Sequence, residues 1–258
     1  ILDCPGSVEL LHTSACALAV ADMAVIVVDP SPDRAAMAAP FLRLVEESGT
    51  PALILIHKVD VLDGRVRDVV EALQAHTPRR LLLRQVPWRE GERVVGYLDL
   101  ASERAWRYRD GAASEAAPMP DALRGRGAEA RAALAEALAD HDDALLEAIV
   151  EDRAPDAAAL YRPLHVEEAA GHAMAVLLGA AEHAAGVRRL WKALRHDAPE
   201  VAETAARRGV PGSAEPVAQV FRTVGAGHAG RLSHVRIWRG AVRDGASVGG
   251  QRIGGLWR

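Results

Sequence analysis

The chain has 258 residues, of which 50% are hydrophobic and only 4% aromatic, with a formal net charge of −4 and a pI near 6.2. This length exceeds that of most single domains, so we expect two domains or one domain with a large insertion. The slightly acidic balance excludes a strong basic nucleic-acid patch, so any contact with nucleic acid has to be local.

The composition also bears on the compartment. Cys4 and Cys16 stand close together without the spacing of a metal site, which favours a reducing, cytoplasmic location. No apolar run approaches the roughly 20 residues that a membrane helix needs, and the chain opens in mid-element rather than with a signal-peptide start. We therefore expect no membrane partner.

The first third of the chain alternates between two patterns. Residues 24–28 and 51–56 are short, continuous, apolar runs, whereas residues 8–20 and 35–47 are longer and have helical periodicity. This alternation predicts an α/β domain whose parallel sheet is covered by helices on both faces.

The middle of the chain departs from this pattern and then returns to it. We expect a helix at 67–76, strand-like pieces at 81–86 and 93–100, a polar stretch at 109–127, helices at 128–150 and 166–172, and a strand at 173–178. This order indicates an α+β subdomain inserted into the first domain.

The last part of the chain is different again. Residues 217–224 and 232–238 alternate between apolar and polar positions and are separated by Gly-containing turns, which predicts antiparallel strands. There are too few such strands to close a barrel, so we expect the chain to end inside a β domain.

A first candidate site is Asp3-Cys4-Pro5-Gly6, which directly follows strand-like residues. Ligands of open α/β sheets bind at the carboxyl ends of strands, where Asp3 could hold a water of Mg²⁺ and the Gly6 N–H could approach a phosphate. Because Asp-x-x-Gly is a common sequence, an ordinary turn is the alternative.

A second candidate, His57-Lys58-Val59-Asp60, follows an apolar strand and contains one of only two lysines in the chain. It resembles the Asn-Lys-x-Asp signature that reads guanine, with His57 in place of Asn. In that signature the Asp accepts two hydrogen bonds from the base, each contributing about 1.5–3 kcal/mol, and the Lys stem lies over the purine. The alternative is a solvated Lys-Asp pair that ends a strand.

A third candidate, Gly179-Ala180-Ala181, follows the strand at 173–178. In GTPases a Ser-Ala pair at this point offers backbone N–H groups to the guanine carbonyl. Ala180 stands at the Ser position, and the contact is mostly made by the backbone. As a motif it has little specificity alone.

Together these motifs resemble elongation factor G, over nearly the whole chain. The resemblance rests on the order of the three motifs and on the insertion between the second and third. Gln85-Val86-Pro87 and residues 95–100 are similar to the strand pair of that family's extra subdomain. Residues 230–232, 236–240, 244–245 and 252–254 are similar to the opening of its second, β-barrel domain.

The resemblance implies an α/β fold, with a P-loop GTPase-like parallel sheet, an inserted α+β subdomain and a partial antiparallel β-barrel domain. The implied boundaries are 1–77 for the first part of the GTPase domain, 78–172 for the inserted subdomain, 173–200 for the rest of the GTPase domain, 201–215 for a linker and 216–258 for the start of the β-barrel domain.

The implied function is ribosome-dependent GTP hydrolysis coupled to translocation, with GTP or GDP and Mg²⁺ as cofactors. The implied nucleotide-binding residues are Asp3 and Gly6, for Mg²⁺ and the γ-phosphate, and His57, Lys58, Asp60, Ala180 and Ala181, for guanine. The implied partners are the ribosome and the guanine nucleotide.

Three departures leave the enzyme assignment open. The phosphate-binding loop would precede Ile1, so this chain is expected to bind nucleotide poorly or not at all. Ser7 stands where the family usually has a catalytic His, and its short hydroxyl cannot act as a cation. His57 cannot offer donor and acceptor in the fork of an amide. The alternatives are a diverged, non-hydrolysing module that binds the ribosome or another partner, and an α/β domain unrelated to nucleotides.

Two other patterns have simpler interpretations. His165, Glu168 and His172 have a spacing that could place metal ligands on one helix face, but a surface helix is the favoured interpretation. Trp88, Trp106 and Trp238 lie in strand-like contexts, where core packing is favoured over stacking on RNA.

Overall fold

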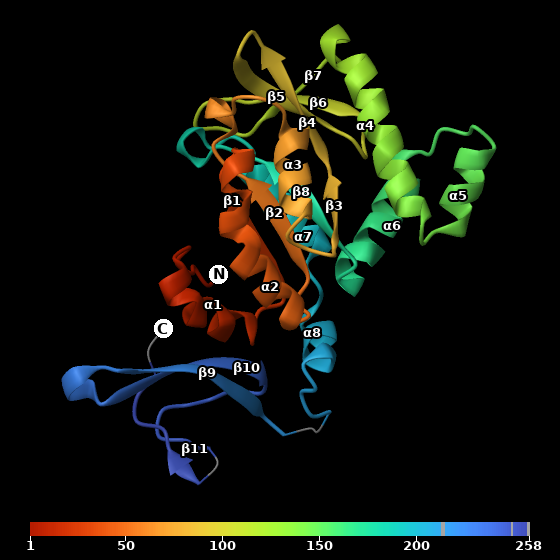
Figure 1. The fold of residues 1–258 in the computed structure, drawn as a ribbon. Helices are drawn as coiled ribbons and strands as arrows, with labels where there is room; N and C mark the ends of the chain where they lie inside the picture. The colour runs from red at the N-terminus through yellow and green to blue at the C-terminus, as the bar shows by residue number, and fades with distance from the viewer. Residues whose placement is uncertain (213–214, 249, 257–258) are drawn as a thin grey trace. The chain divides into compact units, whose positions relative to one another are not determined.

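The computed structural model describes residues 1–212, 215–248 and 250–256 (Figure 1). It divides into a larger unit, Met23–Pro199, and a smaller unit formed by Ile1–Asp22 and Glu200–Arg258. In this division residues 1–22 group with the C-terminal part of the chain, whereas the predicted first part of the GTPase domain runs over 1–77, and that boundary stays a prediction. The other predicted domain boundaries stay predictions.

The centre of the larger unit is a parallel sheet with the strand order β1-β2-β8-β3. Its strands are β1 (Ala24–Val28), β2 (Ala52–Ile56), β8 (Ala173–Leu178) and β3 (Arg80–Leu83). Every residue of β2 and β8 is buried, as expected for strands covered on both faces. The predicted parallel sheet is therefore confirmed.

Helices cover this sheet on two sides. Leu53 and Leu55 of β2 point to one face, where they pack with Leu190 and Ala193 of α7 (Val187–Asp197). Helices α2 (Ala39–Glu47) and α3 (Val66–Gln74) lie over the other face in Figure 1. This layering follows from the alternation of strand-length and helical runs in the sequence.

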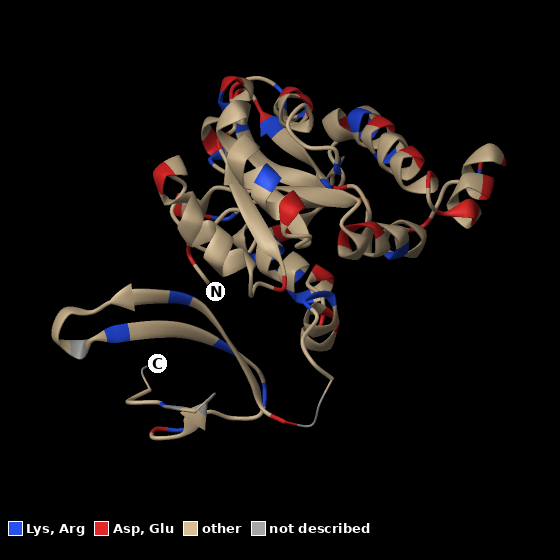
Figure 2. Ribbon diagram, turned by 60° about the horizontal axis from the view of Figure 1, so that its bottom comes forward, with Lys and Arg blue, Asp and Glu red and all other residues tan. Residues whose placement is uncertain are grey.

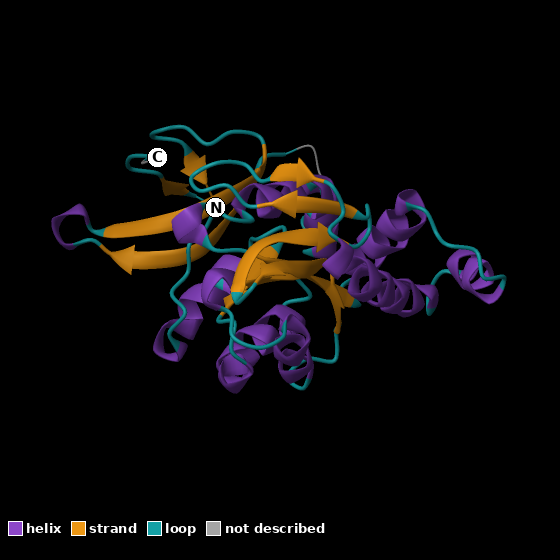
Figure 3. Cartoon of the chain, turned by 90° about the horizontal axis from the view of Figure 1, so that it is seen from above, coloured by secondary structure: helices purple, strands orange, loops and turns teal. Residues whose placement is uncertain are grey.

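The inserted region forms a second, antiparallel sheet with three helices, visible in Figure 3. The sheet has the order β4 (Gln85–Glu90), β5 (Arg93–Asp99), β6 (Arg104–Arg107) and β7 (Glu115–Ala117), and the helices are α4 (Asp121–Ala139), α5 (Asp143–Val150) and α6 (Ala157–Ala170). One buried cluster joins β4, β5 and the three helices to Leu82 of β3 and Ala173 of β8. The insertion and the parallel sheet thus share a core.

Several expected elements differ from those observed. The polar stretch at 109–127 contains β7 and the first turns of α4. The helix expected at 35–47 is a 3-10 helix, Pro32–Ala38, followed by α2. The strand at 81–86 is split, because β3 pairs with β8 in the parallel sheet whereas β4 begins the antiparallel one. The helix at 128–150 is two helices, since the Asp142 carboxylate accepts the Leu145 N–H at 2.9 Å and starts α5 anew. The helix expected at 166–172 begins at Ala157, where Asp156 caps it in the same way.

The smaller unit combines α1 (Leu11–Leu18) and α8 (Val201–Arg207) with two strand pairs, β9 (Val217–Gly225) with β10 (Arg231–Arg239) and β11 (Ser247–Val248) with β12 (Gln251–Arg252). The antiparallel pairing agrees with the predicted β segments. Trp238 is nearly buried and donates its indole N–H to Gln219 at 2.9 Å. The linker expected at 201–215 contains α8, and its residues 213 and 214 lie outside the described part of the chain.

Figure 2 shows Lys or Arg and Asp or Glu interspersed along the helices of the larger unit. Within the described residues, no helix is both long and apolar enough to cross a membrane.

Candidate functional site

Two of the three sequence motifs lie at the same edge of the parallel sheet. Strands β2 and β8 are parallel neighbours, with Ile56 opposite Leu178 at their last positions. The loops that follow these residues, 57–60 and 179–181, therefore leave the sheet side by side. This is the edge where open α/β sheets bind their ligands.

Backbone hydrogen bonds fix the first loop. The N–H of His57 donates to the Val28 carbonyl at 2.9 Å, and the N–H of Val59 donates to the Gly179 carbonyl at 3.2 Å. Lys58, between them, has a left-handed backbone with φ of 56°, which is uncommon for a residue with a side chain. The loop is thus held to strands on both of its sides.

The second loop is equally constrained. The Gly179 N–H donates to the Ile56 carbonyl at 3.0 Å, and Ala180 and Ala185 exchange two backbone hydrogen bonds. Gly186 closes the loop with φ of +73°, and a Cβ on it would lie 2.2 Å from the Leu178 carbonyl oxygen. Only glycine fits there without moving the loop.

Replacing Gly186 by Ala is therefore expected to destabilise the larger unit by about 2 kcal/mol or more, since a left-handed backbone and a backbone clash add together. Chemical denaturation measures the change. Gly91→Ala is the control, because Gly91 also has a positive φ, of 61°, but its Cβ would meet nothing within 4 Å. Equal losses for the two variants would contradict the role given to the clash.

The side chain of His57 bridges the two loops. Its Nε2 accepts the backbone N–H of Ala181 at 3.0 Å, which requires a ring that is unprotonated at Nε2. This is a backbone N–H of the pair that the family resemblance assigns to the guanine carbonyl. No local pattern signals this contact, because the two residues are 124 positions apart.

Asp60 presents a partly exposed carboxylate at the same edge. Its side chain is 34% exposed, and its Oδ2 lies 4.0 Å from His183 Nε2. The Nδ1 of His183 lies 3.1 Å from Asp110 Oδ1. No motif pointed to His183 or Asp110 beforehand. Asp60 retains oxygen lone pairs for a donor from outside.

Lys58 borders an open hollow of about 540 Å³. The hollow is lined by Asp29, Pro30, Ser31, Pro32, Asp33, Arg34, Lys58, Val61 and Asp63. Its three carboxylates outnumber its two cations, and Arg34 is paired with Asp29 at 3.1 Å. This excess of carboxylates is unlike the lining of a phosphate site, and the role of Lys58 stays a prediction.

The remaining predicted residues belong to the smaller unit. Asp3, Gly6 and Ser7 lie in an extended, exposed segment before α1, and Ser7 Oγ donates to Glu9 Oε2 at 3.3 Å. They are in a different unit from Lys58 and Asp60. Their roles at Mg²⁺ and phosphate therefore stay predictions.

Among the described residues, no group of three or more His, Cys, Asp or Glu side chains is placed to hold a metal ion. The spacing of His165, Glu168 and His172 illustrates why. Glu168 is fully buried, whereas His165 is exposed, so these residues do not share one helix face.

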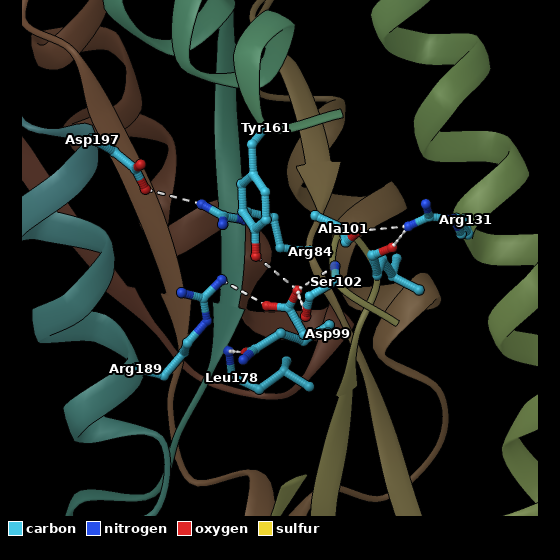
Figure 4. Close-up of polar contacts among 11 residues, drawn as sticks. Arg84, Asp99, Ala101, Ser102, Arg131, Tyr161, Leu178, Arg189 and Asp197 are labelled. Atoms are coloured by element: carbon cyan, nitrogen blue, oxygen red, sulfur yellow. Dashed lines mark hydrogen bonds and ion pairs between the residues drawn. The ribbon is translucent and has the colours of Figure 1, made fainter. Parts of the chain in front are cut away.

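A buried polar network links α7, β5 and α6 (Figure 4). Arg189 of α7 donates to Asp99 Oδ2 at 2.6 Å, and the same carboxylate accepts from Ser102 and from Tyr161. Arg84 reaches across to Asp197 at 2.9 Å. Helix α7 directly follows the 179–186 loop, so the network connects that loop's helix with the inserted subdomain.

The environment of this network shifts two carboxyl groups in opposite directions. Burial raises the pKa of Asp99, but the charge of Arg189 and hydrogen bonds from Ser102 outweigh it, so the pKa is lowered overall. Burial raises the pKa of Glu168 to about 8. Neither oxygen of Glu168 has a hydrogen-bond partner among the described residues. Asp99 is thus a charged anchor, whereas burial favours the protonated form of Glu168 at neutral pH.

Known proteins resemble this chain along its length. Residues 1–200 match the elongation factor Tu GTP binding domain. An elongation factor G-like protein of Synechocystis sp. is 39% identical over 100% of this chain and 39% of its own length. Elongation factor G 2 of Streptomyces coelicolor is 28% identical over 96% of this chain and 38% of its own.

A solved structure agrees with the fold. A crystal structure of a Thermus thermophilus protein superposes with a TM-score of 0.75 at 26% identity, covering 95% of this chain and 36% of that one. The chain thus spans about two fifths of the length of its curated relatives. From the match over residues 1–200, the chain belongs to the elongation factor Tu GTP-binding domain family, and along its length it is similar to elongation factor G-like proteins.

Proposed function

We propose that this chain supplies the guanine-reading half of a GTP-binding translation factor of the elongation factor G type. The observation that supports it is the pair of loops, 57–60 and 179–181, hydrogen-bonded to each other at one sheet edge with the Asp60 carboxylate open. Family membership makes guanine nucleotide the expected ligand class.

Base selection follows from the chemistry of these groups. Asp60 accepts two N–H donors from the guanine edge, and the apolar stem of Lys58 covers the ring. A backbone N–H at Ala180 or Ala181 donates to the guanine carbonyl. Adenine lacks the matching donors and would leave the carboxylate unpaired, which rejects it.

We propose further that the whole protein performs ribosome-dependent GTP hydrolysis coupled to translocation in the cytoplasm. In that activity Asp3 and Gly6 would bind Mg²⁺ and the γ-phosphate. Bound Mg²⁺ would neutralise charge on the phosphates. The described residues do not form a ligand set for this ion by themselves.

The second candidate function is a diverged relative that docks on the ribosome or another partner without hydrolysing GTP. Ser7 at the usual His position supports it, since a hydroxyl is shorter than imidazole and cannot act as a cation. The His57–Ala181 hydrogen bond supports it too, because it occupies a donor that guanine would use.

Calorimetric titration of GDP, with ADP as the control, tests the proposal on the full gene product, including any segment encoded before Ile1. Binding of GDP with a Kd of about 1 μM or tighter, without binding of ADP, would support the guanine site. If neither nucleotide binds, the guanine-reading role is wrong and the docking module is the better account.

Replacing His57 by Asn is expected to strengthen GDP binding about 3- to 10-fold. In the wild type, the Ala181 N–H must give up its hydrogen bond to the imidazole before it can donate to guanine, and the substitution removes that imidazole. The same titration measures it. His76→Asn is the control, since that histidine is exposed and follows α3 away from the motif loops. Weaker binding by the His57 variant would show instead that the imidazole supports the site.

A further inference from the structure

Helix α7 has one face that the guanine site does not explain. Its inward face is fixed by three kinds of contact. Leu190 and Ala193 pack in the sheet's apolar cluster, Arg189 pairs with Asp99, and Asp197 accepts from Arg84 (Figure 4). The orientation of the helix about its own axis is therefore determined, and so is the set of residues that it turns outward.

The outward residues are Arg188, Trp191, Lys192 and Arg195, which we call the α7 cationic face. Their spacing of three, four and seven places them along a single stripe of the helix. All four are exposed, and Trp191 has 51% of its surface accessible. The stripe contains no acidic residue. Its cations lie over about 10 Å of helix, from the rise of 1.5 Å per residue.

The cations of this face are unpaired among the residues that the structure describes. Arg188, Lys192 and Arg195 take part in no hydrogen bond or ion pair there. Some other exposed arginines of the larger unit form ion pairs, such as Arg65 with Asp68, Arg124 with Asp121 and Arg153 with Glu151. Arg43, Arg93 and Arg104 are also exposed without a partner among the described residues, but they lie on separate elements, so in this unit only α7 gathers such cations on one stripe. Lys192 is also one of only two lysines in the sequence. The α7 cationic face is thus an uncompensated positive stripe on an acidic chain.

We propose that the α7 cationic face binds a single-stranded segment of RNA, with the three cations on phosphates and Trp191 stacked on an unpaired base. A stripe of cations interrupted by an exposed aromatic ring is the arrangement that binds single strands without reading sequence. An acidic peptide would use the same charges but gain little from the indole. The contact goes beyond guanine recognition and needs no nucleotide.

The contact is local, in agreement with the interspersed charges on the rest of the larger unit. No sequence pattern predicts the exposure of Trp191, because it depends on which face of α7 packs on the sheet. With three phosphates neutralised, the logarithm of the binding constant should fall with the logarithm of salt concentration with a slope of about −2.

Fluorescence anisotropy of a labelled oligouridine, titrated with the chain without nucleotide, tests this. Changing Arg188, Lys192 and Arg195 together to Gln is expected to weaken binding at least about 10-fold. The matched control changes Arg65, Arg124 and Arg153 to Gln, which removes the same charge from exposed sites elsewhere, and is expected to change binding less than about 2-fold. Circular dichroism melting checks that each variant is folded.

The role of the ring has its own test. Trp191→Ala is expected to weaken binding about 5- to 100-fold, whereas Trp191→Phe retains a stacking surface and most of the affinity. If the α7 triple variant and the control triple variant lose equal RNA affinity, the proposal is wrong and binding depends on net charge alone. An unchanged affinity of Trp191→Ala, or equal binding of oligoglutamate, would overturn it in favour of an acidic partner, and no binding to RNA at low salt would reject it outright.

Discussion

Asp60→Asn in the full gene product is expected to weaken GDP binding about 100-fold or more. Two charge-assisted hydrogen bonds to the base contribute about 1.5–3 kcal/mol each, and an amide has no net charge and one acceptor fewer. Because Asn has nearly the same volume, the loop at 57–60 should keep its backbone contacts with Val28 and Gly179. Calorimetric titration measures the loss.

The nearby Asp63→Asn is the matched control. Asp63 lies in the same loop region and borders the hollow beside Lys58, but it does not belong to the motif. Its substitution removes the same charge and is expected to change the Kd of GDP less than about 2-fold. Titration with the xanthine nucleotide sharpens the test, since xanthine has a carbonyl where guanine has an amine and can accept from the new amide. Unchanged GDP affinity in Asp60→Asn would remove Asp60 from base recognition.

Glu168→Gln is expected to raise the free energy of unfolding at alkaline pH by up to about 5 kcal/mol, at about 1.4 kcal/mol per pKa unit. Burial raises the pKa of Glu168 from its ordinary 4.5 to about 8. Arg84 and Arg189 lower it and Asp197 raises it, but these charges do not cancel the burial. Glutamine keeps the shape of the protonated acid and cannot ionise.

The direction of the pH dependence follows from the raised pKa. The folded state holds this proton more tightly than the unfolded state. The protonated Glu168 therefore makes its full contribution to the free energy of unfolding below pH 4.5, and this contribution is lost as pH rises through about 8. Wild type and Glu168→Gln should therefore have similar stabilities in acid and diverge above neutrality, as measured by denaturant unfolding across pH. Glu147→Gln, on the exposed side of α5, is the control. A parallel pH profile for Glu168→Gln and wild type would show that the carboxyl is hydrated.

Much of the larger unit was predictable because its signals are local. Strands β2 and β8 are short apolar runs without polar alternation, and every residue of both is buried, as such a run predicts. Strand β1 has the same pattern, yet its Val27 is 59% exposed. The motif residues His57 and Gly179 directly follow such runs, so a parallel sheet was enough to predict that they share one edge.

Elements that depend on distant partners were not predictable in the same way. Residues 81–86 look like one strand, yet Leu83 pairs with Val176 in parallel whereas Val86 pairs with Leu98 in antiparallel. The break before α5 depends on a single cap at Asp142 within a helix-favouring sequence. When one continuous element and two shorter ones agree equally well with the local sequence propensities, those propensities cannot predict which of them forms.

By itself, the sequence determined the sheet, the positions of the motif loops and the family, because periodicity and motif order are properties of neighbouring residues. Only the tertiary structure decided that His57 occupies the Ala181 N–H, that Glu168 is buried without a partner among the described residues and that Trp191 is exposed. Each of these depends on which face of a helix or loop meets a segment far away in the chain. Burial and hydrogen bonding across such distances are set by packing, which no local pattern records.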